Sequence, residues 1–276
     1  MNKKRFIFII LCFFSSGNIF AQIAGRPLVA SYTGIGTYSL NHVDAFSFTL
    51  NQASLAQVKN AAVGIFGERR FLLNELSFYN AVIALPTSSG NFGLKTLYYG
   101  SESYNETQLG LAYGRKLGTK LDIGAQFNYN GISINSYGNA SIISIEIGTM
   151  LHLTNQVHTG FHINNPVGVK FGKDQQEKMP SVYTIGIGYD ASEKFLISAE
   201  IVKEENQDVT VNAGIQYRLI PQLHTRAGIS AANGMTWIGV GFFYKNFRVD
   251  LSSSYHPKLG LSPGLLMLFN FKQKEK

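Results

Sequence analysis

Apolar and polar positions alternate along much of the chain, and residues 208–218 (DVTVNAGIQYR) show the pattern most clearly. Every second residue from Val209 to Tyr217 is apolar, while the positions between them are polar or glycine. In an extended chain, alternate side chains point to opposite faces, so this stretch has one apolar face and one polar face. A tilted strand of about 11 residues is long enough to cross a bilayer. The pattern predicts one strand of a membrane barrel.

The rest of the chain supplies further strands of this kind. From residue 61 onward we predict about 14 strands, the number expected of a barrel between small filled barrels and open porins. They span residues 61–69, 75–85, 92–99, 105–115, 120–134, 141–153, 157–164, 182–190, 194–203, 208–218, 223–230, 236–244, 247–255 and 264–271. The segment 120–134 changes phase at Asn130-Gly131, which predicts a bulge or a turn there. The expected fold is all-β, a transmembrane antiparallel β-barrel.

Connection lengths support this prediction, because bacterial barrels have short periplasmic turns and longer outer loops. If both termini are periplasmic, the even-numbered connections should be the short ones. These are residues 86–91, 116–119, 154–156, 191–193, 219–222 and 245–246, whereas the odd-numbered ones include the long stretch 165–181. Aromatic residues border the short turns and predict an interfacial girdle, namely Tyr113, Tyr189, Tyr217, Tyr244, Phe247, Phe269 and Phe271.

Residues 1–21 have the features of a secretory signal peptide. Lys3, Lys4 and Arg5 precede an apolar stretch, and Ala21 is a plausible cleavage position. The apolar stretch is too short to span a bilayer as a helix. Cys12 is the only cysteine and lies within this signal, so the mature chain needs no disulfide. The expected location is the outer membrane of a Gram-negative cell.

Composition agrees with export to a membrane. The sequence has 15% charged and 13% aromatic residues, 28 glycines and a mean hydropathy of +0.02. Cleavage of the signal removes three of the 24 basic residues, which leaves 21 against 17 acidic ones and no basic cluster. A nucleic-acid partner is therefore not expected. About 250 mature residues would form one barrel rather than two domains, and we assign the barrel to residues 61–276.

Residues 22–60 lack clean alternation and are predicted to form a plug inside the barrel. Asn51 can cap a short helix that runs to Lys59 and contains Ala53, Leu55 and Ala56. An irregular stretch of this length is too long for a tether and can fill a lumen. The alternative is a leader without fixed structure.

Inward-facing positions of the predicted strands are mostly small or polar, with a few charged residues: Asp122, Glu146, Glu200, Arg226, Arg248 and Asp250. Counting from the turn at residues 245–246 places Phe243 opposite Arg248 and Gly241 opposite Asp250, and counting from Ser192 pairs Asp190 with Lys194. We expect such charges to neutralise one another across strands rather than to bind a ligand.

Histidines are the strongest candidates for catalysis or metal binding. His152 and His158 would lie opposite each other across a hairpin, with Cβ atoms about 5 Å apart, whereas His158 and His162 are separated by about 13 Å of strand. Two imidazoles without a third ligand are weak evidence for a metal. No nucleophile elbow, zinc helix or phosphate loop is present in the sequence. We therefore predict no catalytic site, no metal and no cofactor, with a lumenal hydrolase as a minor alternative.

Several short stretches together resemble a known family. Asp44 and Ala45, followed by Asn51, Ala53, Leu55 and Ala56, resemble the D-x-x-A…N-P-A-x-L-A signature of FadL-like outer-membrane proteins, and in particular the PorV/PorQ family associated with type IX secretion. The resemblance continues through residues 113–118, 165–166, 178–181, 185–189, 213–218, 226–229 and 255–260. In two respects the chain departs from this family: Gln52 replaces the proline of the signature, and the chain is shorter than typical members.

The resemblance implies a barrel with an N-terminal plug, a Bacteroidetes-type outer membrane and two possible roles. The first is a non-enzymatic component of type IX secretion or surface attachment, which would bind partner proteins through residues 165–181 and other outer loops. The second is a FadL-like passive channel for small hydrophobic molecules, gated by residues 23–59. The implied partners are outer-membrane lipid together with either secretion proteins and cargo or a small hydrophobic ligand.

Overall fold

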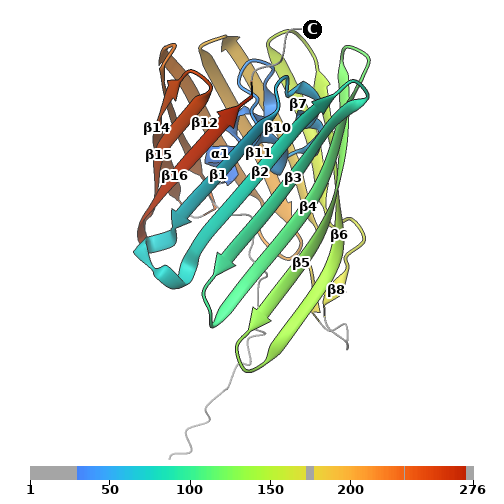
Figure 1. The fold of residues 1–276 in the computed structure, drawn as a ribbon, viewed down its shortest axis with the longest axis vertical. Coiled ribbons are helices and arrows are strands. Elements are labelled where there is room, and N and C mark those ends of the chain that lie inside the picture. Colours follow the sequence, from blue (N-terminus) through green and yellow to red (C-terminus); the bar gives the residue numbers. More distant parts are fainter. Residues whose placement is uncertain (1–29, 172–176, 233, 272–276) are drawn as a thin grey trace, which may run out of the picture.

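A computed structural model describes residues 30–171, 177–232 and 234–271, and it shows a closed antiparallel barrel of fourteen strands (Figure 1). The barrel strands are β1 (Ala62–Arg69), β2 (Ser77–Thr87), β3 (Gly90–Gly100), β4 (Tyr104–Leu117), β5 (Leu121–Ile134), β6 (Gly138–His152), β7 (Val157–Asn164), β10 (Val182–Ser192), β11 (Phe195–Glu204), β12 (Thr210–Ile220), β13 (Leu223–Ser230), β14 (Met235–Tyr244), β15 (Phe247–His256) and β16 (Gly260–Asn270). Pairing of β1 with β16 closes the sheet. The predicted signal peptide lies outside the described residues.

The predicted fold class is confirmed, and each predicted strand coincides with a barrel strand. The expected irregularity at Asn130-Gly131 is wrong, because Asn130 pairs with Gln108 and Gly131 with Thr107 in unbroken register. The change of phase has another cause: Ile132, an apolar residue, keeps an inward position and lines a cavity. The sequence also gave no signal for a two-stranded hairpin, β8 (Lys170–Phe171) with β9 (Glu177–Lys178), in the long connection after β7.

The outer face of the barrel is apolar along its whole circumference. Ile65, Leu111, Ile143, Ile238 and Leu251 lie on different strands, and each exposes more than half of its surface, from 54% to 66%. Such a band suits contact with lipid rather than water. Among the described residues, no helix is long and apolar enough to cross a membrane.

The short turns and the long connections lie at opposite ends of the barrel. The chain reverses between β14 and β15 and between β2 and β3 at one end, where β16 also finishes, whereas residues 70–76, 165–171 and 177–181 lie at the other. Two 3₁₀ turns, η4 (Arg70–Leu72) and η5 (Asn74–Leu76), form the first of these long connections. By the usual asymmetry of such barrels, the end with short turns is periplasmic and the other is the outer end.

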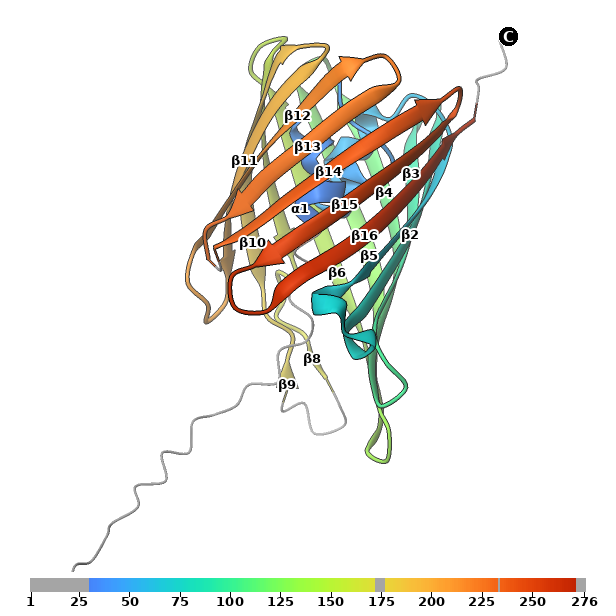
Figure 2. The same ribbon diagram turned by 90° about the vertical axis from the view of Figure 1, so that its left-hand side faces the viewer.

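Residues 30–60, here called the N-terminal segment, lie inside the barrel (Figures 1 and 2, blue). The segment contains α1 (Ala30–Thr33) and the 3₁₀ helices η1 (Ile35–Tyr38), η2 (Ser47–Thr49) and η3 (Gln52–Gln57). Its apolar side chains, among them Phe46 and Leu55, pack with inward residues such as Phe66 and Leu266 in one buried cluster. The segment therefore supplies much of the apolar core that a barrel interior of this size needs.

Inward glycines mark the positions where this segment approaches the wall most closely. A Cβ atom on Gly188 would lie 1.7 Å from the carbonyl oxygen of Tyr38, and one on Gly124 would lie 2.4 Å from the carbonyl carbon of Gln52. Any larger residue at these positions would displace the segment. The glycine-rich inner face is thus a packing surface for residues 30–60.

Candidate ligand cavity and the lumenal network

The N-terminal segment is joined to strands β13 and β15 by a buried charge cluster of Asp44, Arg226, Arg248 and Asp250. Asp44 Oδ2 lies 2.8 Å from Arg248 Nη1 and 3.5 Å from Arg226 Nη2. Asp250 lies 3.1 Å from Arg248 Nε and 3.7 Å from Arg226 Nη1. The predicted register, with Phe243 opposite Arg248 and Gly241 opposite Asp250, is correct. Within the wall, Asp250 faces both arginines, and Asp44 of the signature motif supplies the second carboxylate that balances their two positive charges.

Asp190 makes a different contact from the one predicted. Its expected partner Lys194 is wrong, because a register shift between Asp190 and Ser192 places Asp190 opposite Leu196. The carboxylate instead accepts hydrogen bonds from the Ser39 hydroxyl at 2.6 Å and the Leu40 amide at 3.0 Å. A residue expected to form a cross-strand ion pair thus binds the N-terminal segment.

His152 and His158 lie opposite each other on β6 and β7, as the spacing predicts. Their Nδ1 atoms are 3.0 Å apart, and the outer nitrogens face Asp122 at 2.8 Å and Asp190 at 3.4 Å. Gln57, at the end of η3, donates to Asp122 at 2.5 Å. Among the described residues no group of three or more potential metal ligands is found. The histidine pair thus links Ser39 and Gln57 of the N-terminal segment through one chain of polar contacts.

Glu146 is the centre of a second network. Its carboxylate accepts hydrogen bonds from Gln52 at 2.6 Å and Asn128 at 2.8 Å, and it faces His162 Nε2 at 2.9 Å. Lys95 Nζ lies 3.6 Å from the same group. Gln52, the residue that departs from the family signature, is therefore the residue that ties η3 to the wall here. Glu200, another predicted lumenal carboxylate, lies apart and accepts from Asn212 at 2.9 Å.

The remaining signature residues lie around the same helix. Asn51 caps η3, because its side chain accepts from the amide of Ala53 at 3.0 Å and its amide group donates to the Thr149 carbonyl at 3.1 Å. Ala45, Ala53, Leu55 and Ala56 are all buried. The motif residues therefore set the conformation of the segment and its seat on the wall.

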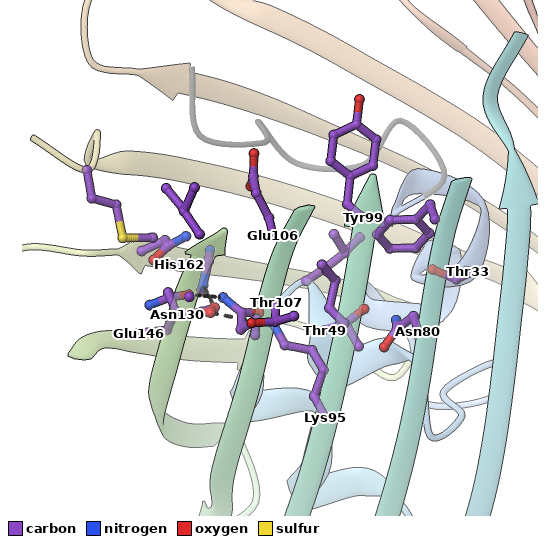
Figure 3. A pocket seen from close by; sticks show the side chains of 18 of the residues that line it. Thr33, Thr49, Asn80, Lys95, Tyr99, Glu106, Thr107, Asn130, Glu146 and His162 are labelled. Atoms are coloured by element: carbon purple, nitrogen blue, oxygen red, sulfur yellow. Dashed lines mark hydrogen bonds and ion pairs between the residues drawn. The ribbon is translucent and has the colours of Figure 1, made fainter. Parts of the chain in front are cut away.

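A cavity of about 120 Å³, here called the outer cavity, lies between the N-terminal segment and the outer end of the barrel (Figure 3). Thr33, Thr49 and Leu50 of the segment form its inner side, and inward residues of β2–β7 form its wall. Phe171 and Met179, from the long connection after β7, cover it and are themselves buried. Of the six lumenal charges proposed from sequence, only Glu146 lines this cavity.

Several cavity residues were missed by sequence reasoning. Lys95 on β3 and Asn80 on β2 face inward. Lys95 is a basic residue whose neighbours on the inward face of β3, Gly93 and Leu97, are small or apolar. That inward charge was an available signal. Arg70 gave none, because it follows the end of β1 and reaches the cavity only through the fold; its guanidinium stacks at 5.0 Å from the ring of Tyr99 and 5.6 Å from that of Phe78.

A second cavity, of about 220 Å³, lies at the opposite side of the segment. Asp44, Ala45 and Gln57 contribute to it from the segment, and Arg226 and Arg248 from the wall. Residues of the N-terminal segment thus line both a mixed apolar and polar cavity toward the outer end and a charged cavity toward the periplasmic end.

Comparison with known proteins gives structural matches only. No family model matches the chain, and no curated protein matches it in sequence. Among solved structures, the chain is similar to the CymD monoaromatic hydrocarbon channel, with a TM-score of 0.66, 14% identity, and coverage of 89% of this chain and 98% of that one. The P. putida toluene transporter TodX gives a TM-score of 0.64 and 12% identity, covering 84% and 95% of the two chains.

A Pseudomonas aeruginosa FadL homologue is also similar, with a TM-score of 0.60 and 10% identity over 88% of this chain and 96% of that one. At such identities the likeness shows the fold. The fold of the chain is similar to that of this FadL homologue, as the sequence resemblance implied, while the narrower PorV/PorQ resemblance finds no counterpart among these three structures.

Proposed function

We propose that this protein is a passive outer-membrane channel for small hydrophobic or amphipathic molecules, closed in the present structure by residues 30–60. The observation that carries the proposal is the outer cavity, which has apolar and polar residues in its wall and is separated from the second, charged cavity by the buried N-terminal segment. Its size suits a ligand of a few carbon atoms to a single ring, since engineered apolar cavities of about 150 Å³ bind benzene.

Two further observations support this role over catalysis. The histidine pair His152 and His158 and its two carboxylates, Asp122 and Asp190, are engaged in contacts that hold the segment, and none of the four lines the outer cavity. The three similar structures carry channel or transporter names or belong to a FadL homologue. An outer-membrane location after removal of residues 1–21 completes the proposal.

The experiment that tests the channel uses a reversible lock. Ser39 Oγ lies 2.6 Å from Asp190 Oδ1, so a Ser39→Cys/Asp190→Cys variant places two thiols in contact, and the mature chain otherwise contains no cysteine. Cells whose outer membrane carries the variant should take up an aromatic dye such as N-phenylnaphthylamine only after reduction. Wild-type protein treated with the same reductant is the control. If cells that carry the variant exclude the dye in both redox states, and cells that carry the wild-type protein exclude it as well, the channel proposal is refuted.

Partnership with type IX secretion is a second candidate, which rests on the sequence resemblance to the PorV/PorQ family and would imply a Bacteroidetes-type source. The structural neighbours favour the channel. Moreover, residues Phe171 and Met179 of the proposed docking loop point into the barrel and cover the outer cavity. Co-purification of secretion components with the native protein from its own membranes would support this role, and normal secretion in a deletion strain would oppose it.

A further inference from the structure

The outer cavity contains a hydrogen-bond acceptor without a partner. Asn80 Oδ1 is buried and makes no hydrogen bond to any part of the chain that the structure describes, although the residue is only 7% exposed and lines the cavity (Figure 3). Asn164, on β7, also lines the cavity, and its Oδ1 is likewise buried without a hydrogen bond to the described residues. Buried carbonyl oxygens are nearly always hydrogen-bonded in folded proteins, so these two atoms are open to a donor on a ligand.

Lys95 supplies the complementary donor. It lies on β3 two residues from Leu97, the residue directly opposite Asn80, so that its side chain is a diagonal neighbour of Asn80. Its ammonium is almost completely buried and lies 3.6 Å from Glu146, which exceeds hydrogen-bonding distance. An ammonium carries three donors, so it can serve a ligand oxygen while it neutralises this carboxylate.

The charges around the cavity disfavour a charged ligand. Lys95 and Arg70 contribute two positive groups, and Glu106 and Glu146 contribute two negative ones. An added carboxylate or ammonium would be desolvated without a net opposite charge, which is unfavourable. The remaining surface is formed by Phe78, Leu97, Tyr99, Ile132, Phe171 and Met179, which suit an apolar or aromatic body.

We infer that the outer cavity binds a small neutral aromatic molecule that carries a hydroxyl group, of which phenol is the simplest example, in preference to a bare hydrocarbon. The hydroxyl donates to Asn80 Oδ1 and accepts from Lys95, while the ring lies against the aromatic and aliphatic side chains. A hydrocarbon of the same size fills the cavity but leaves Asn80 Oδ1 without a hydrogen-bond partner in the part of the chain that the structure describes, and it leaves Lys95 with only its ion pair to Glu146. A site built to hydrogen-bond a ligand discriminates strongly against an analogue that lacks the polar group. This inference rests on the proposed channel function.

The test compares phenol with toluene, which have nearly the same shape, by isothermal titration of the purified full-length protein in detergent. We expect wild-type protein to bind phenol more tightly than toluene by on the order of tenfold, and Asn80→Leu to remove this preference. Benzoate should bind more weakly than phenol. The matched control is Asn212→Leu, since Asn212 also faces inward with an unpartnered Oδ1 but does not line this cavity.

Equal affinity of wild-type protein for phenol and toluene would overturn the inference, whether or not the variant folds. A double variant, Asn80→Leu with Asn164→Leu, that folds and still prefers phenol to toluene as strongly as the wild type would also overturn it. Both results leave the channel proposal intact if dye uptake still depends on reduction of the Ser39→Cys/Asp190→Cys lock, so the two proposals fail in different experiments.

Discussion

Gln52 Nε2 donates a 2.6 Å hydrogen bond to Glu146 Oε2, and both residues are buried. This contact joins η3, near the C-terminal end of the N-terminal segment, to the carboxylate that also faces Lys95 at the wall of the outer cavity. The floor of the proposed ligand site and the attachment of the segment therefore share one group. A change in the surroundings of Glu146 should therefore affect both the attachment of η3 and the wall of the outer cavity.

Replacing Gln52 with leucine should loosen η3 without removing side-chain volume. A hydrogen bond to a charged group contributes about 1.5–3 kcal/mol, and Glu146 keeps its contacts with Asn128 and His162. Hydrogen exchange of the amides in residues 51–58 should become faster. Asn41→Ala is the control, because Asn41 lies on the same segment with an exposed side chain. Unchanged exchange in Gln52→Leu would show that the contact does not hold the helix.

Loss of Arg248 should destabilise the folded barrel severely. Arg248→Met would leave the carboxylates of Asp44 and Asp250 close together with only Arg226 between them, and breaking a buried ion pair from one side costs about 3–5 kcal/mol. Asp44→Asn should cost less, because Asp250 still contacts both arginines and the asparagine keeps an acceptor oxygen at the position that faces Arg248. Urea unfolding in detergent measures both, with Lys245→Met in an exposed turn as the control. Equal costs for the two variants would contradict this account.

A methyl group at Gly186 should displace the segment, because its Cβ would lie 2.0 Å from Cζ of Tyr38. Trp237, the only tryptophan of the chain, packs edge-to-face at 5.6 Å from Tyr32 of the same segment and reports on its position. We expect the fluorescence of Gly186→Ala to shift to the red as Trp237 becomes hydrated. Addition of Tyr38→Ala makes room for the methyl group and should reverse the shift; a shift that persists in the double variant would place the disturbance elsewhere.

The cover of the outer cavity should loosen in acid. Lys178 Nζ lies 2.5 Å from Glu205 Oε1, and this hydrogen bond holds the pKa of the Glu205 carboxyl below its usual range. A carboxyl whose pKa is lowered by folding stabilises the folded arrangement above its ordinary pKa and loses that contribution as the pH falls through the lowered value. Because the pair is exposed, the effect should be small and sensitive to salt.

Hydrogen exchange of residues 177–181, followed at low salt from neutral pH into the acidic range, tests this expectation once intrinsic rates are corrected. Glu205→Gln should show the loosened behaviour already at neutral pH and no further change on acidification. A wild-type protein whose corrected exchange is independent of pH would rule out a role for the pair in holding the cover.

The strands were readable from sequence because the environment on each side of the wall differs. Lipid selects apolar residues on the outer face, and the lumen selects small and polar ones, so alternation marks the strands directly; β7 and β13 begin and end at the predicted residues. The same rule failed at Ile132, because this inward side chain lines the outer cavity, whose wall includes apolar residues. Alternation reports the polarity of the surroundings, and a change of phase need not be a change of backbone.

The contacts inside the lumen could be predicted only in part from the sequence. Pairs across a tight turn, such as His152 with His158, follow from counting residues, whereas Asp190 was misassigned because a register shift occurs beside the turn. Asn80 and Asn164 could not have been recognised as members of one site. Their strands are separated by four others in the barrel, and only closure of the sheet brings them to the same cavity.

The sequence by itself determined the wall: the strand count, the lipid-facing and lumen-facing positions and the location of the short turns, because each depends on local periodicity and turn length. The tertiary structure alone decided which inward residues meet. Contacts such as Asp44 with Arg248 and Gln52 with Glu146 join residues far apart in the chain, and they form because residues 30–60 fold back into the closed barrel against a glycine surface shaped to receive them.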